Sequence, residues 1–143
     1  MNTQVMFSSK TNEWGTPLKL FNELNQEFHF TLDPCSTHEN KKCDKHYTVD
    51  EDGLSHSWEG EVVFCNPPYG REIPKWVEKA ATEKATTVLL IPARTDTKYF
   101  HDYIYGKAEI RFLRGRVRFE KEPGVPGDAA PFPSMVVIFR NEK

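Results

Sequence analysis

The stretch that decides the fold is Glu61–Gly70, which reads EVVFCNPPYG. Its first half is a short run of apolar, β-favouring residues, and its second half contains two prolines, which cannot donate to a strand ladder. We therefore expect a buried strand at 61–65 that ends in a rigid loop, Asn66-Pro67-Pro68-Tyr69. The apolar spacing that follows predicts a helix at 74–84.

Further strands are predicted on the C-terminal side of this stretch. Residues 86–91 form a continuous apolar, β-branched run of the kind that is buried on both faces of a sheet. Weaker patterns predict strands at 108–113 and 116–120, then a loop rich in proline and glycine, and a final strand at 135–139. Asp96 can cap a helix that runs to Tyr105.

On the N-terminal side, Thr16 can cap a helix whose first residue is Pro17, and apolar residues then recur at helical spacing through Phe28. The aromatic stretch 28–32 predicts a strand that stops at Asp33-Pro34. Alternation of strands and helices indicates an α/β fold with antiparallel strands near the C-terminus.

The length of the chain, 143 residues, suits one hydrophobic core. We expect a flexible N-terminal arm at 1–13 and a single domain at 14–143. The formal net charge of −2 argues against a broad polyanion-binding surface but allows a local basic patch. No apolar run is long enough to span a bilayer, and three cysteines fit a reducing compartment, so we expect a cytoplasmic protein.

Three predicted strands end in residues that can bind or react with a ligand: Asp33-Pro34, the Asn66–Tyr69 loop, and Pro92-Ala93-Arg94. In an open parallel sheet, ligands bind outside the carboxyl ends of the strands. The side-chain oxygen of Asn66 and the carbonyl of Pro67 could accept both N–H groups of an aromatic amine and hold its nitrogen for attack on a methyl donor. Tyr69 offers a flat face on which an extruded base could stack.

Six segments together carry a family resemblance. They are WGTP at 14–17, LDPC at 32–35, DGL at 52–54, NPPYG at 66–70, PARTD at 92–96 and RVRF at 116–119. This arrangement resembles the bacteriophage Dam-type DNA N6-adenine methyltransferases. The resemblance implies a compact Rossmann-like methyltransferase fold, S-adenosylmethionine as cofactor, double-stranded DNA as partner and adenine N6 as the methyl acceptor.

The resemblance also assigns roles to individual residues. Asn66, Pro67, Pro68 and Tyr69 would form the catalytic loop, with Asn66 also near the cofactor. The remaining cofactor-binding candidates are Trp14, Thr16, Pro17, Asp33, Pro34 and Asp52. The chain departs from amino-methyltransferases at the first strand, where Asp33-Pro34 replaces a glycine-rich turn.

These motifs also have plainer interpretations. Asparagine and proline are turn formers, Asp33-Pro34 is an ordinary strand terminator, and Asp52-Gly53 is a common turn. The position of the Asn66–Tyr69 loop between a buried strand and a helix favours the functional interpretation.

Four arginines are candidates for DNA contact. Arg94 follows a predicted strand, and Arg114, Arg116 and Arg118 share one face if a strand continues through Gly115. A solvated strand face is the alternative. Cys35, His38, Cys43 and His46 are spaced in two close pairs, but the gap between the pairs is shorter than in usual zinc sites, so we expect no metal.

Two other functions remain open. The Asn66–Tyr69 motif alone also resembles methyltransferases that act on RNA or on protein glutamine, and the missing glycine-rich turn allows a catalytically inactive nucleic-acid-binding module.

Overall fold

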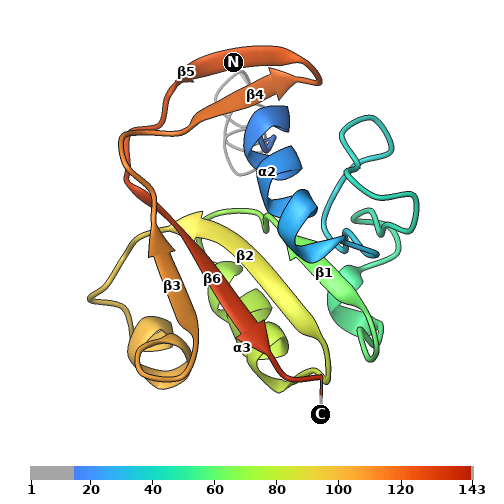
Figure 1. Cartoon of the computed structure of the whole chain (residues 1–143), viewed down its shortest axis with the longest axis vertical. Coiled ribbons are helices and arrows are strands. Elements are labelled where there is room, and N and C mark those ends of the chain that lie inside the picture. Colours follow the sequence, from blue (N-terminus) through green and yellow to red (C-terminus); the bar gives the residue numbers. More distant parts are fainter. Residues whose placement is uncertain (1–14, 143) are drawn as a thin grey trace, which may run out of the picture.

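In the computed structural model, which describes residues 15–142, the chain forms a mixed α/β structure built on a four-stranded sheet. The strand order is β1 (Val62–Cys65), β2 (Thr86–Pro92), β6 (Ser134–Arg140) and β3 (Glu109–Phe112). β1 runs parallel to β2, whereas β6 is antiparallel to both of its neighbours, β2 and β3 (Figure 1). The predicted α/β class with antiparallel pairing near the C-terminus is confirmed.

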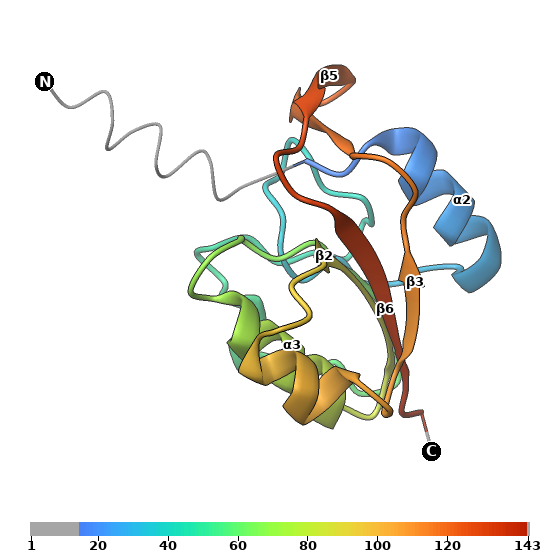
Figure 2. The same ribbon diagram turned by 90° about the vertical axis from the view of Figure 1, so that its left-hand side faces the viewer.

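Helices cover both faces of this sheet, as Figure 2 shows. Helix α2 (Leu18–Phe28) lies on one face, and α3 (Ile73–Thr82) lies on the other together with a π-helical turn, η2 (Phe100–Ile104). The ring of Phe21 in α2 meets the ring of Phe64 in β1 edge-on, with centroids 5.2 Å apart. Within the described part of the chain, no helix is long and apolar enough to cross a membrane.

The strand predicted at 28–32 is wrong over most of its length. Phe28 is the last residue of α2, and His29 ends the helix with a left-handed backbone, φ 57°. Only Leu32, through one parallel bridge, continues the sheet beside β1. The aromatic residues of this stretch are therefore divided between α2 and the segment that leads to Leu32. Phe28 packs against the core from the last position of the helix.

The start of α2 also differs from the prediction. Pro17 occupies the cap position instead of the first helical position, and Thr16 does not cap the helix. The backbone N–H of Leu18 instead donates to the carboxylate of Glu120, at 3.2 Å. A residue 102 positions away therefore supplies the helix cap.

The segment after β2 is helical at 98–104, close to the predicted helix that runs to Tyr105, but Asp96 does not cap it. Its last five residues form the π-helical turn, whose cap position is Tyr99, with no side-chain cap. The Asp96 side chain is exposed to solvent instead.

A separate two-stranded hairpin, β4 (Arg118–Glu122) with β5 (Val125–Ala129), projects beyond the edge at which β1, β2 and β3 end (Figure 1). The break predicted between the strands at 108–113 and 116–120 is confirmed, since β3 ends before Gly115, which has φ +76°, and β4 begins after it. The prediction of a proline- and glycine-rich loop is wrong in part, because this stretch contains β5. The sequence VPGDA has no apolar alternation, so its strand depends on pairing with β4.

Candidate active site

A cavity of about 290 Å³ lies at the edge of the sheet where Asp33 and the Asn66–Tyr69 loop end their strands. Its lining includes five predicted cofactor-binding residues: Thr16, Asp33, Pro34, Asp52 and Asn66. Pro68 lines the cavity as well, whereas Pro17 and Pro67 do not. Trp14 and the predicted arm at 1–13 lie outside the described residues. Residues far apart in sequence thus converge at the carboxyl ends of the strands.

Asn66 directly follows β1 and is half-buried in the cavity wall. Its side-chain nitrogen Nδ2 donates a hydrogen bond of 2.9 Å to the hydroxyl of Thr16. Thr16 is 3% exposed, so this bond is shielded from water. The buried β1 strand and the Thr16 hydroxyl together define where the Asn66 carboxamide lies.

Tyr69 packs into the core in this conformation. Its side chain is 6% exposed, and its hydroxyl donates to the backbone carbonyl of Leu90 at 3.1 Å. Phe119 and Phe132 meet its ring edge-on, with centroids 5.8 and 5.6 Å away. Burial raises the pKa of Tyr69 well above its usual value. Stacking of a base on Tyr69 stays a prediction, and it requires the ring to be uncovered first.

Asp33 is buried beside the cavity and organises the chain around it. Its carboxylate accepts backbone N–H groups from Lys42, at 2.9 Å, and from Cys35, at 3.4 Å. Burial raises the pKa of Asp33 to about 6, against the opposing effect of these two donors. Since both of its oxygens accept backbone hydrogen bonds, Asp33 shapes the loop that follows it.

Gly53, in the loop between Pro34 and β1, lies in close contact with Pro34. A Cβ atom at this position would lie 2.0 Å from the carbonyl oxygen of Pro34, which no side chain could tolerate. Neighbouring Asp52 has a left-handed backbone, φ 55°, and its carboxylate accepts the N–H of Leu54 at 3.3 Å. The turn expected at Asp52-Gly53 is therefore present, and it also forms one wall of the cavity.

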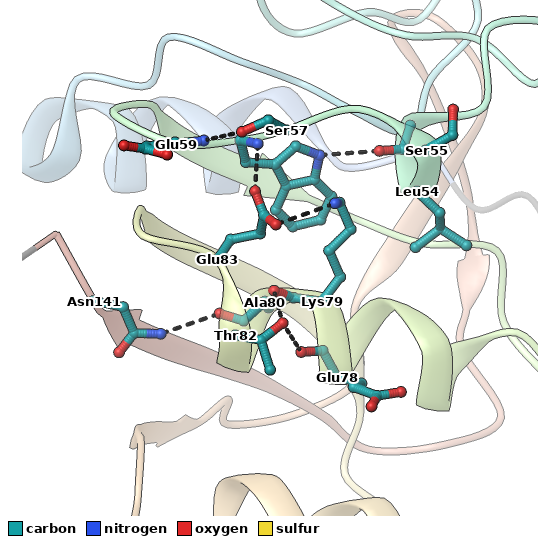
Figure 3. Close-up of polar contacts among 12 residues, drawn as sticks. Leu54, Ser55, Ser57, Glu59, Glu78, Lys79, Ala80, Thr82, Glu83 and Asn141 are labelled. Atoms are coloured by element: carbon teal, nitrogen blue, oxygen red, sulfur yellow. Dashed lines mark hydrogen bonds and ion pairs between the residues drawn. The ribbon is translucent and has the colours of Figure 1, made fainter.

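Trp58 anchors this wall to α3, and Figure 3 labels Lys79 and Glu83, the two residues at the α3 side of the contact. Its fully buried indole donates from Nε1 to the carbonyl of Gly53 at 3.0 Å, and its backbone N–H donates to Glu83. Lys79 lies 5.2 Å from the centre of the indole ring and pairs with Glu83 at 3.3 Å. Trp58 also stacks on Trp76, which itself lines the cavity. Both tryptophans belong to the buried core.

The cavity wall also includes two polar residues, Glu72 and Ser36, that the sequence did not single out. Three acidic residues, Asp33, Asp52 and Glu72, line the cavity, and Lys42 is the basic residue among its described lining. Ser36 has a buried hydroxyl without a hydrogen-bond partner among the described residues. This cavity therefore combines an acidic character with a buried hydroxyl that a ligand could satisfy.

The four candidate arginines lie outside the cavity lining and are exposed. Arg94 follows β2, while Arg114, Arg116 and Arg118 lie in or beside the link from β3 to β4. Because β3 ends before Arg114 and Gly115 turns the chain, the condition under which Arg114, Arg116 and Arg118 would share one strand face is not met. Arg116 donates to the carbonyl of Ala130 at 3.3 Å.

The cysteine and histidine pattern does not assemble into a metal-binding group. Nδ1 of His38 lies 2.8 Å from Nε2 of His46, so the two rings share a hydrogen bond. Cys43 is half-buried, and burial raises the pKa of its thiol to about 12. In residues 15–142, no set of three or more histidine, cysteine or acidic side chains is arranged to hold a metal ion.

Comparison with known proteins points to methyl transfer. The family model described as DNA N-6-adenine-methyltransferase (Dam) matches residues 3–143. A DNA N-6-adenine-methyltransferase of Haemophilus phage HP1 is 29% identical over 133 residues, which cover 88% of this chain and 77% of that protein. One of Escherichia phage T1 is 30% identical over 105 residues, covering 70% of this chain but 44% of its own length. Since the family match extends over nearly the whole sequence, the chain belongs to the DNA N-6-adenine-methyltransferase (Dam) family.

Proposed function

We propose that this protein transfers a methyl group from S-adenosylmethionine to the N6 amine of adenine in double-stranded DNA. The observation that carries the proposal is the position of Asn66, which ends a buried strand and lines the cavity at the carboxyl edge of the sheet. Family membership supports the reaction class, and the position of Asn66 in the cavity lining supports this edge of the sheet as the place of the reaction.

The proposed fold is a compact Rossmann-like methyltransferase domain comprising residues 14–143. Strands β1, β2 and β3 share one direction, helices cover both faces, and the cavity lies at the carboxyl ends of the strands. These are the features by which an open α/β sheet forms a ligand crevice.

The cavity fits S-adenosylmethionine in its chemistry. This molecule carries a cationic sulfonium, an ammonium and a carboxylate, together with a flat adenine. The carboxylates of Asp33, Asp52 and Glu72 complement its positive charge, while Phe64 and Trp76 provide apolar surface. Of the carboxylates, Asp52 and Glu72 are the exposed ones, and both of Asp33's oxygens already accept backbone N–H groups. We therefore propose that Asp52 binds the ligand directly and that Asp33 supports the wall.

The residues of the Asn66–Tyr69 loop position the reacting amine. When bound, S-adenosylmethionine would supply a methyl group on cationic sulfur, to which the N6 lone pair would bond as the C–S electron pair returned to sulfur. The Asn66 oxygen and the Pro67 carbonyl each accept one N–H, which holds N6 in line for this attack. After transfer the amine loses one proton to water.

DNA must approach at the same edge of the sheet, because a base inside the duplex cannot reach the cavity. Arg94, Arg114, Arg116 and Arg118 are exposed near this edge or on the segment that leads into the projecting hairpin. We propose that they contact phosphates, which would position the duplex without specifying its sequence. The relatives from bacteriophages support action in the cytoplasm of a bacterial host.

The experiment that tests this function is transfer of labelled methyl from S-adenosylmethionine to unmethylated bacterial DNA, with digestion to nucleosides. Label is expected in N6-methyldeoxyadenosine. RNA and protein extracts are assayed in parallel, and label in one of these instead of DNA would replace adenine in DNA with that acceptor. Absence of both transfer and cofactor binding by calorimetry would identify an inactive nucleic-acid-binding module.

A further inference from the structure

We propose that Thr16 is a positioning residue for the reaction: its hydroxyl holds the Asn66 carboxamide in the orientation that methyl transfer requires. The inference rests on the proposed function, since it concerns the same asparagine. It gives Thr16 a role in the chemical step that differs from contact with the cofactor.

The hydrogen bond itself is the first support. Nδ2 of Asn66 donates to Oγ1 of Thr16 at 2.9 Å, and the two residues are 50 positions apart in sequence. Thr16 is almost fully buried, so water cannot readily replace its hydroxyl. Removal of that hydroxyl would take away the acceptor of a shielded N–H.

The position of Thr16 is fixed from both sides by the hairpin. The backbone N–H of Glu120 in β4 donates to the carbonyl of Gly15 at 2.7 Å, and the Glu120 carboxylate accepts the N–H of Leu18 at 3.2 Å. A Cβ atom on Gly15 would come within 2.9 Å of the Glu120 carbonyl oxygen, so the two backbones lie in close contact. Thr16 is therefore held between two residues that are tied to one strand.

The orientation matters because the two arms of a carboxamide have opposite hydrogen-bonding characters. An adenine amine presents N–H donors, so Asn66 must offer its oxygen to this amine. The bond to Thr16 engages the nitrogen arm and thereby sets the direction in which the oxygen arm points. A carboxamide that rotates without this restraint spends less time in the reactive orientation.

The test compares Thr16→Val, which replaces the hydroxyl by a methyl of similar size, with Thr16→Ser, which keeps the hydroxyl. For Thr16→Val we expect kcat to fall about tenfold or more, while the Kd for S-adenosylmethionine stays within about twofold. Thr16→Ser should restore most of kcat. Thr82→Val, which removes a threonine hydroxyl at the far end of α3, is the matched control and should leave both constants unchanged.

Two results would overturn the proposal. One is a weakened Kd with unchanged kcat in Thr16→Val, which would make Thr16 a cofactor contact only. The other is a fall of kcat by about tenfold or more in Thr16→Ser, which keeps the hydroxyl. This result counts even if the valine variant fails to fold, because it is measured against the wild type.

A stability measurement separates failure of this inference from failure of the proposed function. If the wild-type protein does not methylate DNA, the proposed function fails, and thermal unfolding of Thr16→Val, Asn66→Ala and the double variant still tests the bond. We expect the decrease in Tm of the double variant to be smaller than the sum of the two single decreases. Additive decreases would show that the two side chains act independently, and would overturn the inference.

Discussion

The residues that line the cavity and the arginines that we assign to DNA lie in two contrasting regions. The cavity draws its lining from Gly15 to Trp76, and its key side chains are buried or hydrogen-bonded to distant segments. The four arginines are exposed, and Arg116 makes a hydrogen bond to a backbone carbonyl. One region is thus held inside the protein, and the other faces solvent.

This difference in burial indicates which function each region can perform. A site that orients a small amine must be held within a fraction of an ångström, so it needs support from the core. Phosphate contacts tolerate movement, because long charged side chains can follow a flexible polyanion. We therefore expect substitutions in the cavity to change single steps strongly, and substitutions of the arginines to change DNA affinity gradually.

The largest expected effect is that of Asn66→Ala. Removal of the amine acceptor should lower kcat by about 10²–10³-fold, the size seen when a positioned hydrogen-bonding group at a reacting centre is removed. Calorimetry should show S-adenosylmethionine binding nearly as in the wild type. Turnover at the wild-type rate would refute the mechanism. It would also contradict the expectation that substitutions in the cavity have larger effects than those of the arginines.

Asp33 provides a prediction on pH. Because its pKa is raised to about 6 from 3.8, the folded protein holds a proton that the unfolded chain loses between these values. The contribution of Asp33 to the free energy of unfolding is thus present below about pH 4 and falls as pH rises to 6, by up to about 3 kcal/mol.

Urea unfolding of the wild type and Asp33→Asn at pH 4 and pH 7 measures this contribution, since the variant cannot ionise. The stability of the wild type relative to the variant should be greater at pH 4. A relative stability that rises with pH would mean that the two N–H donors outweigh burial, and that the cavity wall prefers a charged Asp33.

Gly53→Ala tests how tightly the cavity wall is packed. The added methyl collides with the Pro34 carbonyl, so we expect the free energy of unfolding to fall by about 1–3 kcal/mol and cofactor binding to weaken. Gly106→Ala is a useful control, because its Cβ would meet nothing within 4 Å although its φ is +76°. That variant should lose some stability to backbone strain but keep its Kd for the cofactor. Equal Kd values in the two variants would argue against a rigid wall.

The smallest effects are expected from single arginine variants. The logarithm of the DNA-binding constant is expected to fall linearly with the logarithm of the salt concentration. Alanine at Arg114, Arg116 or Arg118 should make this slope less steep by about 0.9 for each phosphate that the arginine neutralises. The affinity for the cofactor should stay unchanged. Lys84→Ala, just before the amino end of β2 and therefore at the opposite edge of the sheet, is the control. A slope that stays at the wild-type value in all three arginine variants would assign them to a solvated surface.

Much of the fold could be predicted from local patterns. The apolar runs indicated β1, β2 and β6, and helical spacing indicated α3, because burial of these segments is a property of their own side chains. The β5 strand could not be predicted, since its five residues form a strand only by pairing with β4. The helix cap on α2 was assigned wrongly for a similar reason: its acceptor, Glu120, is distant in sequence.

The candidate site was predicted in part. Motif resemblance and the convergence of strand ends indicated Thr16, Asp33, Asp52 and Asn66, and all four line the cavity. Glu72 and Ser36 were missed, because single polar residues in a helix start or a loop carry no pattern. The covering of Tyr69 by Phe119 and Phe132 was missed as well, since ring contacts between separate segments leave no local signal.

The sequence by itself determined the α/β class, the strand that delivers Asn66, and the family to which the chain belongs, because apolar periodicity and short motifs are local properties. Only the tertiary structure decided that Thr16 holds Asn66 instead of capping α2, that Glu120 caps this helix, and that Asp33 is buried between two backbone donors. Each of these depends on which polar groups meet when water is excluded, and that follows from the packing of segments remote in sequence.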